Sequence, residues 1–243
     1  MKKFFRFRVF CLFALVCSLL GAPAAPAFAS NVDMVQFMWS RGMHMPVGEA
    51  NHETIPVLAR SLRVGDIVFI RNSLYPFQKV SYATRSWTNH VGVVIDISGD
   101  EPIVAESTFP VSRTTALSRF IAKSKDRRVA IGRLNRDLTE EEGKRIAEAS
   151  RKRLGVFYDT GFDLNSEGEF SSRFVREVLA ESTSIVTGKV ETFSDLLSQN
   201  PQTRLAFWRI WFFGKIPWDR QTITPASLLC DPRLHLIFDG YAK

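Results

Sequence analysis

Four short segments rich in β-branched and aromatic residues precede most of the helical segments, and this order restricts the fold class. They are residues 64–70 (a turn followed by a strand), 91–97, 103–105 and 129–134. Residues of these types favour strands. Strands that come first, with helices mostly after them, are typical of α+β domains with an antiparallel sheet. We therefore expect an α+β domain in which an antiparallel sheet packs on helices.

Three helices are expected in the second half of the chain. Thr139 is followed three residues later by Glu142, a capping-box pattern, and this helix should run to about Leu154, where Gly155 ends it. A second helix should follow Ser171, because apolar residues recur there at helical spacing. A third should span residues 202–213, after a proline.

Residues 1–29 have the three parts of a secretory signal peptide. Residues 1–8 carry four basic and no acidic residues, residues 9–21 are apolar, and Ala27-Phe28-Ala29 is a small-x-small cleavage site. The apolar run is shorter than the roughly 20 residues of a spanning helix, which argues against a retained anchor. We expect the mature chain to begin at Ser30 and to be exported, to the periplasm or the medium.

Removal of this segment changes the charge and the cysteine count. Without its four basic residues, 28 basic residues face 25 acidic ones, a net charge of +3. A near-neutral chain offers no electrostatic case for a nucleic-acid partner. Cys11 and Cys17 leave with the segment, so Cys230 has no cysteine to pair with inside the mature chain. We expect Cys230 to act as a small buried hydrophobic residue.

Residues 30–61 are expected to form an N-terminal arm, followed by one domain over residues 62–243. The arm contains methionines at 34, 38, 43 and 45, with His44 among them. Thioethers are soft ligands, so a copper(I) site is the alternative to an apolar arm that packs on the domain. His52, His235 and Glu191 show no ligand spacing, and no glycine-rich phosphate loop is present. We therefore assign no metal and no cofactor.

Three separated residues could form a catalytic site. His90 opens one predicted strand, and Glu106 ends the next. If these strands are neighbours, Glu106 can accept a hydrogen bond from the imidazole and fix its tautomer. Ser171 begins a helix, where free backbone N–H groups favour a developing anion. The alternatives are a structural histidine, a solvated carboxylate, and a serine (Ser171 or Ser172) that only caps the helix.

The motifs that contain these residues resemble a known family. The segments 65–69 (GDIVF), 89–92 (NHVG), 105–107 (AES), 158–159 (YD) and 170–175 (FSSRFV) are similar to those of the YiiX/YebB-like permuted papain-like (NlpC-type) cysteine hydrolases. The YebB-like branch is the most similar. The resemblance covers roughly residues 62–230, and its motifs occur in the family's order.

The resemblance implies a permuted papain-like fold and cleavage of an amide or acyl bond. It makes His90 the family histidine and Glu106 its acidic partner, and it places Ser171 where the family has its nucleophilic cysteine. A hydroxyl is far less acidic than a thiol, so it attacks only if a base removes its proton during the reaction. Three interpretations stay open: Ser171 is a serine nucleophile; the protein is an inactive member that binds a ligand; or the serine is an introduced change, or another residue, such as Ser172, serves instead.

Aromatic residues are expected to shape the pocket, and we assign Trp87, Tyr158 and Ser172 to substrate binding. The segment Phe207–Phe213 is either a core helix or a lip over the site that contacts a membrane surface, where tryptophan and cations are favoured. The second interpretation suits an acyl or lipid substrate. The expected partner is a small-molecule, lipid or peptide substrate.

Overall fold

A computed structural model describes residues 51–198, 200 and 203–243. The predicted signal peptide, the Met/His cluster and most of the predicted arm lie outside these residues. The described part falls within one compact unit. Its sheet strands are β1 (Asn51–Glu53), β2 (Ile67–Asn72), β3 (His90–Asp96), β4 (Ile103–Glu106), β5 (Arg113–Ala116), β6 (Ser124–Leu134) and β9 (Leu234–Ala242).

These seven strands form one sheet in the order β1-β9-β6-β2-β3-β4-β5. Every neighbouring pair is antiparallel except β1 and β9, which are parallel. The remaining elements are α3 (Ile55–Ser61), α4 (Tyr75–Thr84), α5 (Leu117–Ala122), α6 (Glu140–Lys152), α7 (Ser171–Thr183), β7 (Glu191–Thr192), α8 (Phe193–Ser198), α9 (Leu205–Trp211), β8 (Gln221–Thr222) and α10 (Pro225–Leu229). Strands β7 and β8 form a separate two-stranded sheet.

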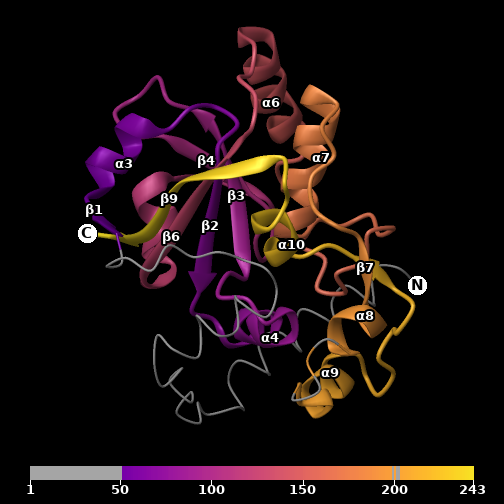
Figure 1. The fold of residues 1–243 in the computed structure, drawn as a ribbon. Helices are drawn as coiled ribbons and strands as arrows, with labels where there is room; N and C mark the ends of the chain where they lie inside the picture. The colour runs from indigo at the N-terminus through magenta and orange to yellow at the C-terminus, as the bar shows by residue number, and fades with distance from the viewer. Residues whose placement is uncertain (1–50, 199, 201–202) are drawn as a thin grey trace. The chain divides into compact units, whose positions relative to one another are not determined.

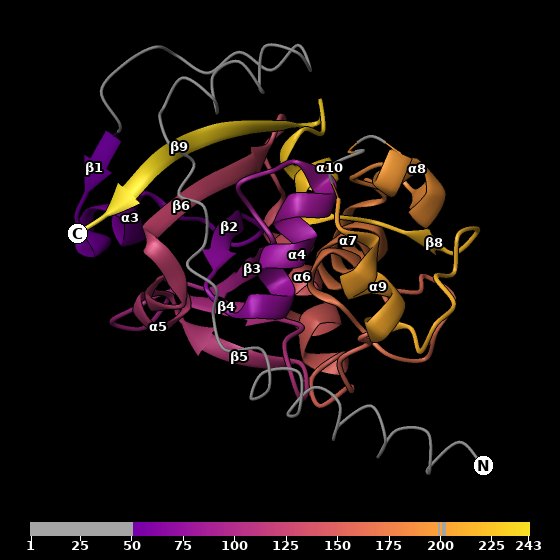
Figure 2. The same ribbon diagram turned by 90° about the horizontal axis from the view of Figure 1, so that it is seen from below.

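The sheet is apolar on both faces, and helices cover each of them (Figures 1 and 2). Side chains alternate along a strand, so Val91 and Val93 of β3 lie on one face while Val94 lies on the other. The first face packs on α6, α7 and α10. The second packs on α3 and α5. The α+β prediction, with an antiparallel sheet between helices, is confirmed.

The predicted helices are present, with shifted ends. The Thr139–Glu142 capping box starts α6, which ends at Lys152 rather than at about Leu154. Helix α7 begins at Ser171. The third helix is shorter than the expected 202–213: α9 ends at Trp211, because Phe213 and Gly214 adopt left-handed φ angles of 52° and 97°.

The domain starts before the predicted boundary at residue 62. Strand β1 pairs with β9, and Leu58 and Leu62 around the end of α3 are buried in the core on the second face of the sheet. Residues 51–61 therefore belong to the domain rather than to an arm. Local sequence does not reveal this, because β1 is a three-residue edge strand whose partner lies at the other end of the chain.

Gly92 on β3 lies where the sheet has no room for a side chain. A Cβ atom there would lie 2.5 Å from Val104 Cγ1 and 2.9 Å from the backbone oxygen of Ala105. Both contacts are with β4, the strand that carries Glu106. Any residue other than glycine would therefore push β3 and β4 apart beside the site.

We expect Gly92→Ala to lower the free energy of unfolding by about 1–3 kcal/mol, the usual cost of overpacking. Urea denaturation measures the change. Gly99→Ala is the matched control, because nothing lies within 4 Å of its added Cβ. Equal stability of the two variants would contradict the close approach of β3 and β4.

Candidate active site

The sheet brings His90 and Glu106 together. His90 begins β3 and Glu106 ends β4, and these strands are antiparallel neighbours. The His90 Nε2 atom lies 2.7 Å from Glu106 Oε2, and neither side chain is exposed to solvent. The carboxylate accepts the proton on Nε2, so a neutral His90 carries no proton on Nδ1. The expected contact between these two residues is present.

The Glu106 carboxylate has three further neighbours. Thr115 Oγ1 donates a hydrogen bond to Oε1 at 2.6 Å, and Lys123 Nζ contacts the same oxygen. The guanidinium of Arg113 lies 3.8 Å from Oε1. Burial alone would raise the pKa of Glu106, but the hydrogen bond from His90, the charge of His90 when the imidazole is protonated, and Lys123 more than offset it and lower that pKa to about 2. Glu106 is therefore an anion at neutral pH.

Two aromatic rings contact the His90 imidazole. The ring of Phe77, on α4, is 5.7 Å away in an edge arrangement, and that of Phe120, on α5, is 5.6 Å away. The His90 Nδ1 atom is buried and has no hydrogen-bond partner among the described residues. A buried ring nitrogen without a partner is uncommon and calls for an explanation.

Ser171 is the first residue of α7. Phe170 at the N-cap provides no side-chain hydrogen bond, so no cap satisfies the first backbone N–H groups of this helix. The neighbouring Ser172 is engaged, because its Oγ donates to the backbone oxygen of Ile223 at 2.8 Å. Both serines are buried, with Ser171 3% exposed.

A small pocket opens beside Ser171. Apolar side chains from α4, α8, α9 and the segment before α7 form most of its wall, and Phe77 is one of them. In the described part of the chain, no hydrogen bond joins the Ser171 hydroxyl to His90. The two residues are linked through Phe77, which contacts the His90 ring and lines the pocket of Ser171.

The residues assigned to substrate binding separate into two groups. Tyr158 and Ser172 line the pocket, and burial raises the pKa of Tyr158, which is therefore neutral. Trp87 is not part of this lining. Its ring instead packs under the guanidinium of Arg128, 4.5 Å from the ring centroid. Trp87 lies in a bend before β3 begins, so its closeness to His90 in sequence does not place the two side chains in one site.

The segment Phe207–Phe213 has two faces. Trp208 and Trp211 are buried, and Trp208 lines the pocket beside Ser171. Ile210 and Phe213 point outward, with exposed fractions of 58% and 60%. The core-helix interpretation therefore accounts for one face and leaves the other open to solvent. None of the helices in the described residues is long and apolar enough to cross a bilayer.

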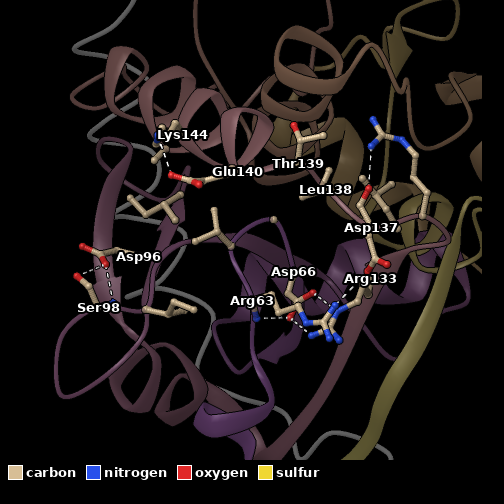
Figure 3. Close-up of a pocket in the computed structure, with 18 of the residues that line it drawn as sticks. Arg63, Asp66, Asp96, Ser98, Arg133, Asp137, Leu138, Thr139, Glu140 and Lys144 are labelled. Carbon is tan, nitrogen blue, oxygen red and sulfur yellow. Dashed lines mark hydrogen bonds and ion pairs between the residues drawn. The ribbon is translucent and has the colours of Figure 1, made fainter.

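A larger cavity, of about 580 Å³, lies at the other end of β3 (Figure 3). Six of its charged side chains form pairs: Asp66 with Arg133, Arg63 with Asp137, and Glu140 with Lys144. Neither His90 nor Ser171 lines it. We therefore associate the candidate site with the smaller pocket beside Ser171 rather than with this larger cavity.

Several residues of the site carry little or no signal in the sequence. Lys123, Thr115 and Phe77 are distant in sequence from both His90 and Ser171, and no local motif marks them. For Phe77, the one available signal was Pro76 at the start of α4, because proline favours the first turn of a helix and so marks the helix that carries Phe77. The expectation for Cys230 was wrong: it lies at the end of α10 and is exposed.

We expect Glu106→Gln to remove a pH-dependent part of the stability. The pKa of Glu106 is lower in the folded protein (about 2) than its ordinary value of 4.5, so its contribution is complete above pH 4.5 and is lost as pH falls toward 2. The contribution is about 3 kcal/mol. Urea denaturation of wild type and variant between pH 7 and 2 should show the difference shrinking below pH 4.5.

Glu141→Gln is the control, because its carboxylate is 70% exposed. If the free energy of unfolding differs between wild type and Glu106→Gln by the same amount down to pH 2, the assignment of Glu106 as a buried anion is contradicted.

Comparison with known proteins agrees with this architecture. Residues 61–238 match the family described as permuted papain-like amidase enzyme, YaeF/YiiX, C92 family. The uncharacterized protein YiiX of Escherichia coli (strain K12) is 23% identical over 182 residues, which cover 74% of this chain and 88% of that protein.

The fold is also similar to that of a solved structure. The crystal structure described as metalloprotein yiiX from Escherichia coli O157:H7 superposes with a TM-score of 0.68 at 21% identity, covering 74% of this chain and 98% of that one. Within residues 51–198, 200 and 203–243, no group of three His, Cys, Asp or Glu residues could hold a metal ion. With its family match extending over most of the domain, this chain belongs to the YaeF/YiiX (C92) family of permuted papain-like amidases.

Proposed function

We propose that this protein hydrolyses an amide or acyl bond, with Ser171 as nucleophile, His90 as general base and Glu106 as the group that orients the base. The observation that supports this is the state of the imidazole. Glu106 holds it through Nε2, while Nδ1 is buried and unpartnered among the described residues. An oriented base with one ring nitrogen left open is what a hydroxyl nucleophile requires.

In the proposed reaction, the Ser171 oxygen bonds to the carbonyl carbon as its proton moves to His90 Nδ1. The negative charge that develops on the carbonyl oxygen is stabilised by the backbone N–H of Ser171 and by the helix dipole of α7, whose first turn has no side-chain cap. The protonated His90 then gives its proton to the leaving group as the bond from that group to the carbonyl carbon breaks, which leaves the acyl group on Ser171 Oγ. A water molecule next attacks this ester while its proton moves to His90, and His90 returns the proton to Ser171 Oγ as the acid is released. Ser171 and His90 make no hydrogen bond in this structure, so the proposed transfer requires their side chains to come closer; Phe77 contacts the imidazole and also lines the pocket of Ser171.

The lining of the pocket favours an apolar group on the substrate. Phenylalanine, leucine and tryptophan side chains surround Ser171, and its polar wall consists mainly of hydroxyl and amide groups. Burying a methylene group contributes about 0.8 kcal/mol, so such a wall selects for an acyl chain or an apolar side chain. A lipid or an apolar peptide fits this requirement.

A second function is a binding protein without turnover. The observation that favours it is the hydroxyl itself: Ser171 stands where the family resemblance places a cysteine, and no hydrogen bond connects it to His90. Under this proposal the pocket binds the same apolar group but does not cleave it.

We further propose that the protein acts outside the cytoplasm, as the signal sequence in residues 1–29 suggests. The relative with the similar fold is described as a metalloprotein. The described residues of this chain do not supply a matching set of ligands, and no step of the proposed reaction passes through a metal.

We expect a fluorophosphonate probe to label the wild-type protein at Ser171, because only an activated hydroxyl reacts with it at a useful rate. Labelling, followed by intact mass, should disappear in Ser171→Ala and fall at least about 100-fold in His90→Ala, the usual contribution of a general base. Ser98→Ala is the control and should label normally, since Ser98 lies at the far end of β3. Absence of labelling in wild type would favour the binding function.

We also propose that the exposed face of α9 and the turn after it contact a membrane surface. Ile210 and Phe213 are exposed there beside Arg209 and Lys215, and Phe213 is held outward at a φ of 52°. An apolar surface flanked by cations suits the interface of an anionic bilayer. Because Trp208 of the same helix lines the pocket, this contact would place the pocket next to the lipid.

Phe213→Asp should weaken sedimentation with phosphatidylglycerol vesicles by about tenfold or more, given the cost of exposing one large apolar side chain. The backbone tolerates the change, since aspartate accepts left-handed φ angles. Ile97→Asp, at a comparably exposed position on the far side of the domain, should have no effect. Equal loss in both variants would contradict a specific contact.

A further inference from the structure

Lys123 contacts Glu106 but has no role in the reaction proposed above. The two carboxylate oxygens of Glu106 are divided between partners. Oε2 accepts from His90 Nε2, whereas Oε1 accepts from Thr115 and contacts Lys123 Nζ. Lys123 is the residue that follows α5, and its side chain is 24% exposed, so its ammonium group is largely removed from water beside the carboxylate.

The positive charges beside Glu106 oppose protonation of His90. Glu106 supplies one negative charge, while Lys123 and Arg113 supply two positive charges within 4 Å of that carboxylate. A protonated imidazole would add a third positive charge. Because the side chains of His90 and Glu106 are fully buried, these charges act through a medium less polar than water.

The other elements that pack near the imidazole contribute uncharged groups or charges engaged elsewhere. Helix α4 presents Phe77 and α5 presents Phe120. Tyr158, which contacts Phe77, is neutral because burial raises its pKa. On α7, Arg173 donates to the backbone of Ser166 and Gly168, and Arg176 donates to the backbone of Thr187 and Gly188.

We propose that Lys123 is a positioning residue whose positive charge offsets the negative charge of ionised Glu106. It thereby keeps His90 unprotonated and ready to accept the proton of Ser171. This inference rests on the roles proposed above for Ser171 and His90. In the step it supports, the proton passes from Ser171 Oγ to His90 Nδ1 while Oγ forms its bond to the carbonyl carbon; Lys123 stays protonated and Glu106 stays ionised. Lys123 acts through Glu106 and does not touch the substrate.

This arrangement suits a hydroxyl better than a thiol. A cysteine nucleophile works as a thiolate beside an imidazolium, and an unopposed carboxylate on the far side of the ring favours that imidazolium. A serine needs the imidazole free of its proton before attack. By balancing Glu106, Lys123 removes the stabilisation of the imidazolium at rest. It leaves the Nε2 hydrogen bond, and therefore the orientation of the ring, in place.

The test is the titration of His90 followed by NMR of protein labelled with ¹⁵N in its histidine rings, with the His90 signal assigned by its absence in His90→Ala. In Lys123→Met, the midpoint of His90 protonation should move upward by about one pH unit or more relative to wild type, the size of effect that a nearby charge has on a buried group. Lys123→Arg should restore the wild-type midpoint. Lys125→Met, an exposed lysine on the neighbouring strand β6, should leave it unchanged.

Arg113→Met provides a second variant should Lys123→Met fail to fold, because the Arg113 side chain is 49% exposed; its shift should be smaller and in the same direction. An unchanged midpoint in both Lys123→Met and Arg113→Met would overturn the inference.

The NMR result does not depend on turnover, so it is separate from the proposed hydrolysis. If wild type reacts with the fluorophosphonate probe, the pH of half-maximal labelling should shift in Lys123→Met by the same amount as the NMR midpoint. If wild type does not react, the proposed hydrolysis fails, and the titration still decides whether Lys123 controls the charge of His90.

Discussion

A carboxylate removed from water costs several kcal/mol unless other groups replace its hydration. Glu106 is such a group. Its two oxygens accept hydrogen bonds from donors on three different elements: β3, β5 and the end of α5. These donors fix the carboxylate, and the carboxylate fixes the imidazole of His90. The orientation of the imidazole therefore depends on a charge that the surrounding fold must keep paired.

The sheet makes this pairing possible because its strands bring distant segments side by side. Strands β3, β4 and β5 follow one another both in sequence and in space, so His90, Glu106 and Thr115 meet within one antiparallel ribbon. The chain then turns through α5, which returns Lys123 to the same carboxylate before β6 joins the other side of β2. Gly92 lets β3 and β4 approach closely beside this cluster.

The part of the site around Ser171 is built differently. Ser171 comes from a helix rather than from the sheet, and its pocket is walled by α4, α8 and α9. Phe77 lies between the two parts, in contact with the imidazole and in the lining of the pocket. His90 and Ser171 are thus held by separate elements of the domain, and Phe77 contacts both parts of the site.

Local sequence determined the main elements and two residues of the site. The strands β2, β3, β4 and β6 and the helices α6 and α7 carry their own signals: β-branched runs, a capping box and apolar residues at helical spacing. The meeting of His90 and Glu106 also followed, since consecutive strands in an α+β domain usually pair. The order of the motifs along the chain was enough to indicate the family.

Tertiary structure alone decided the rest. Strands such as β1, β5 and β9 form because partner strands supply their hydrogen bonds, so their own residues reveal little. Trp87 was expected in the pocket and packs under Arg128, and Cys230 was expected in the core and is exposed. Nothing in the sequence distinguishes Lys123 from the other basic residues of the chain. Only the folded chain places its charge against a buried carboxylate, because electrostatic interactions depend on distance and burial in space and not on separation along the chain.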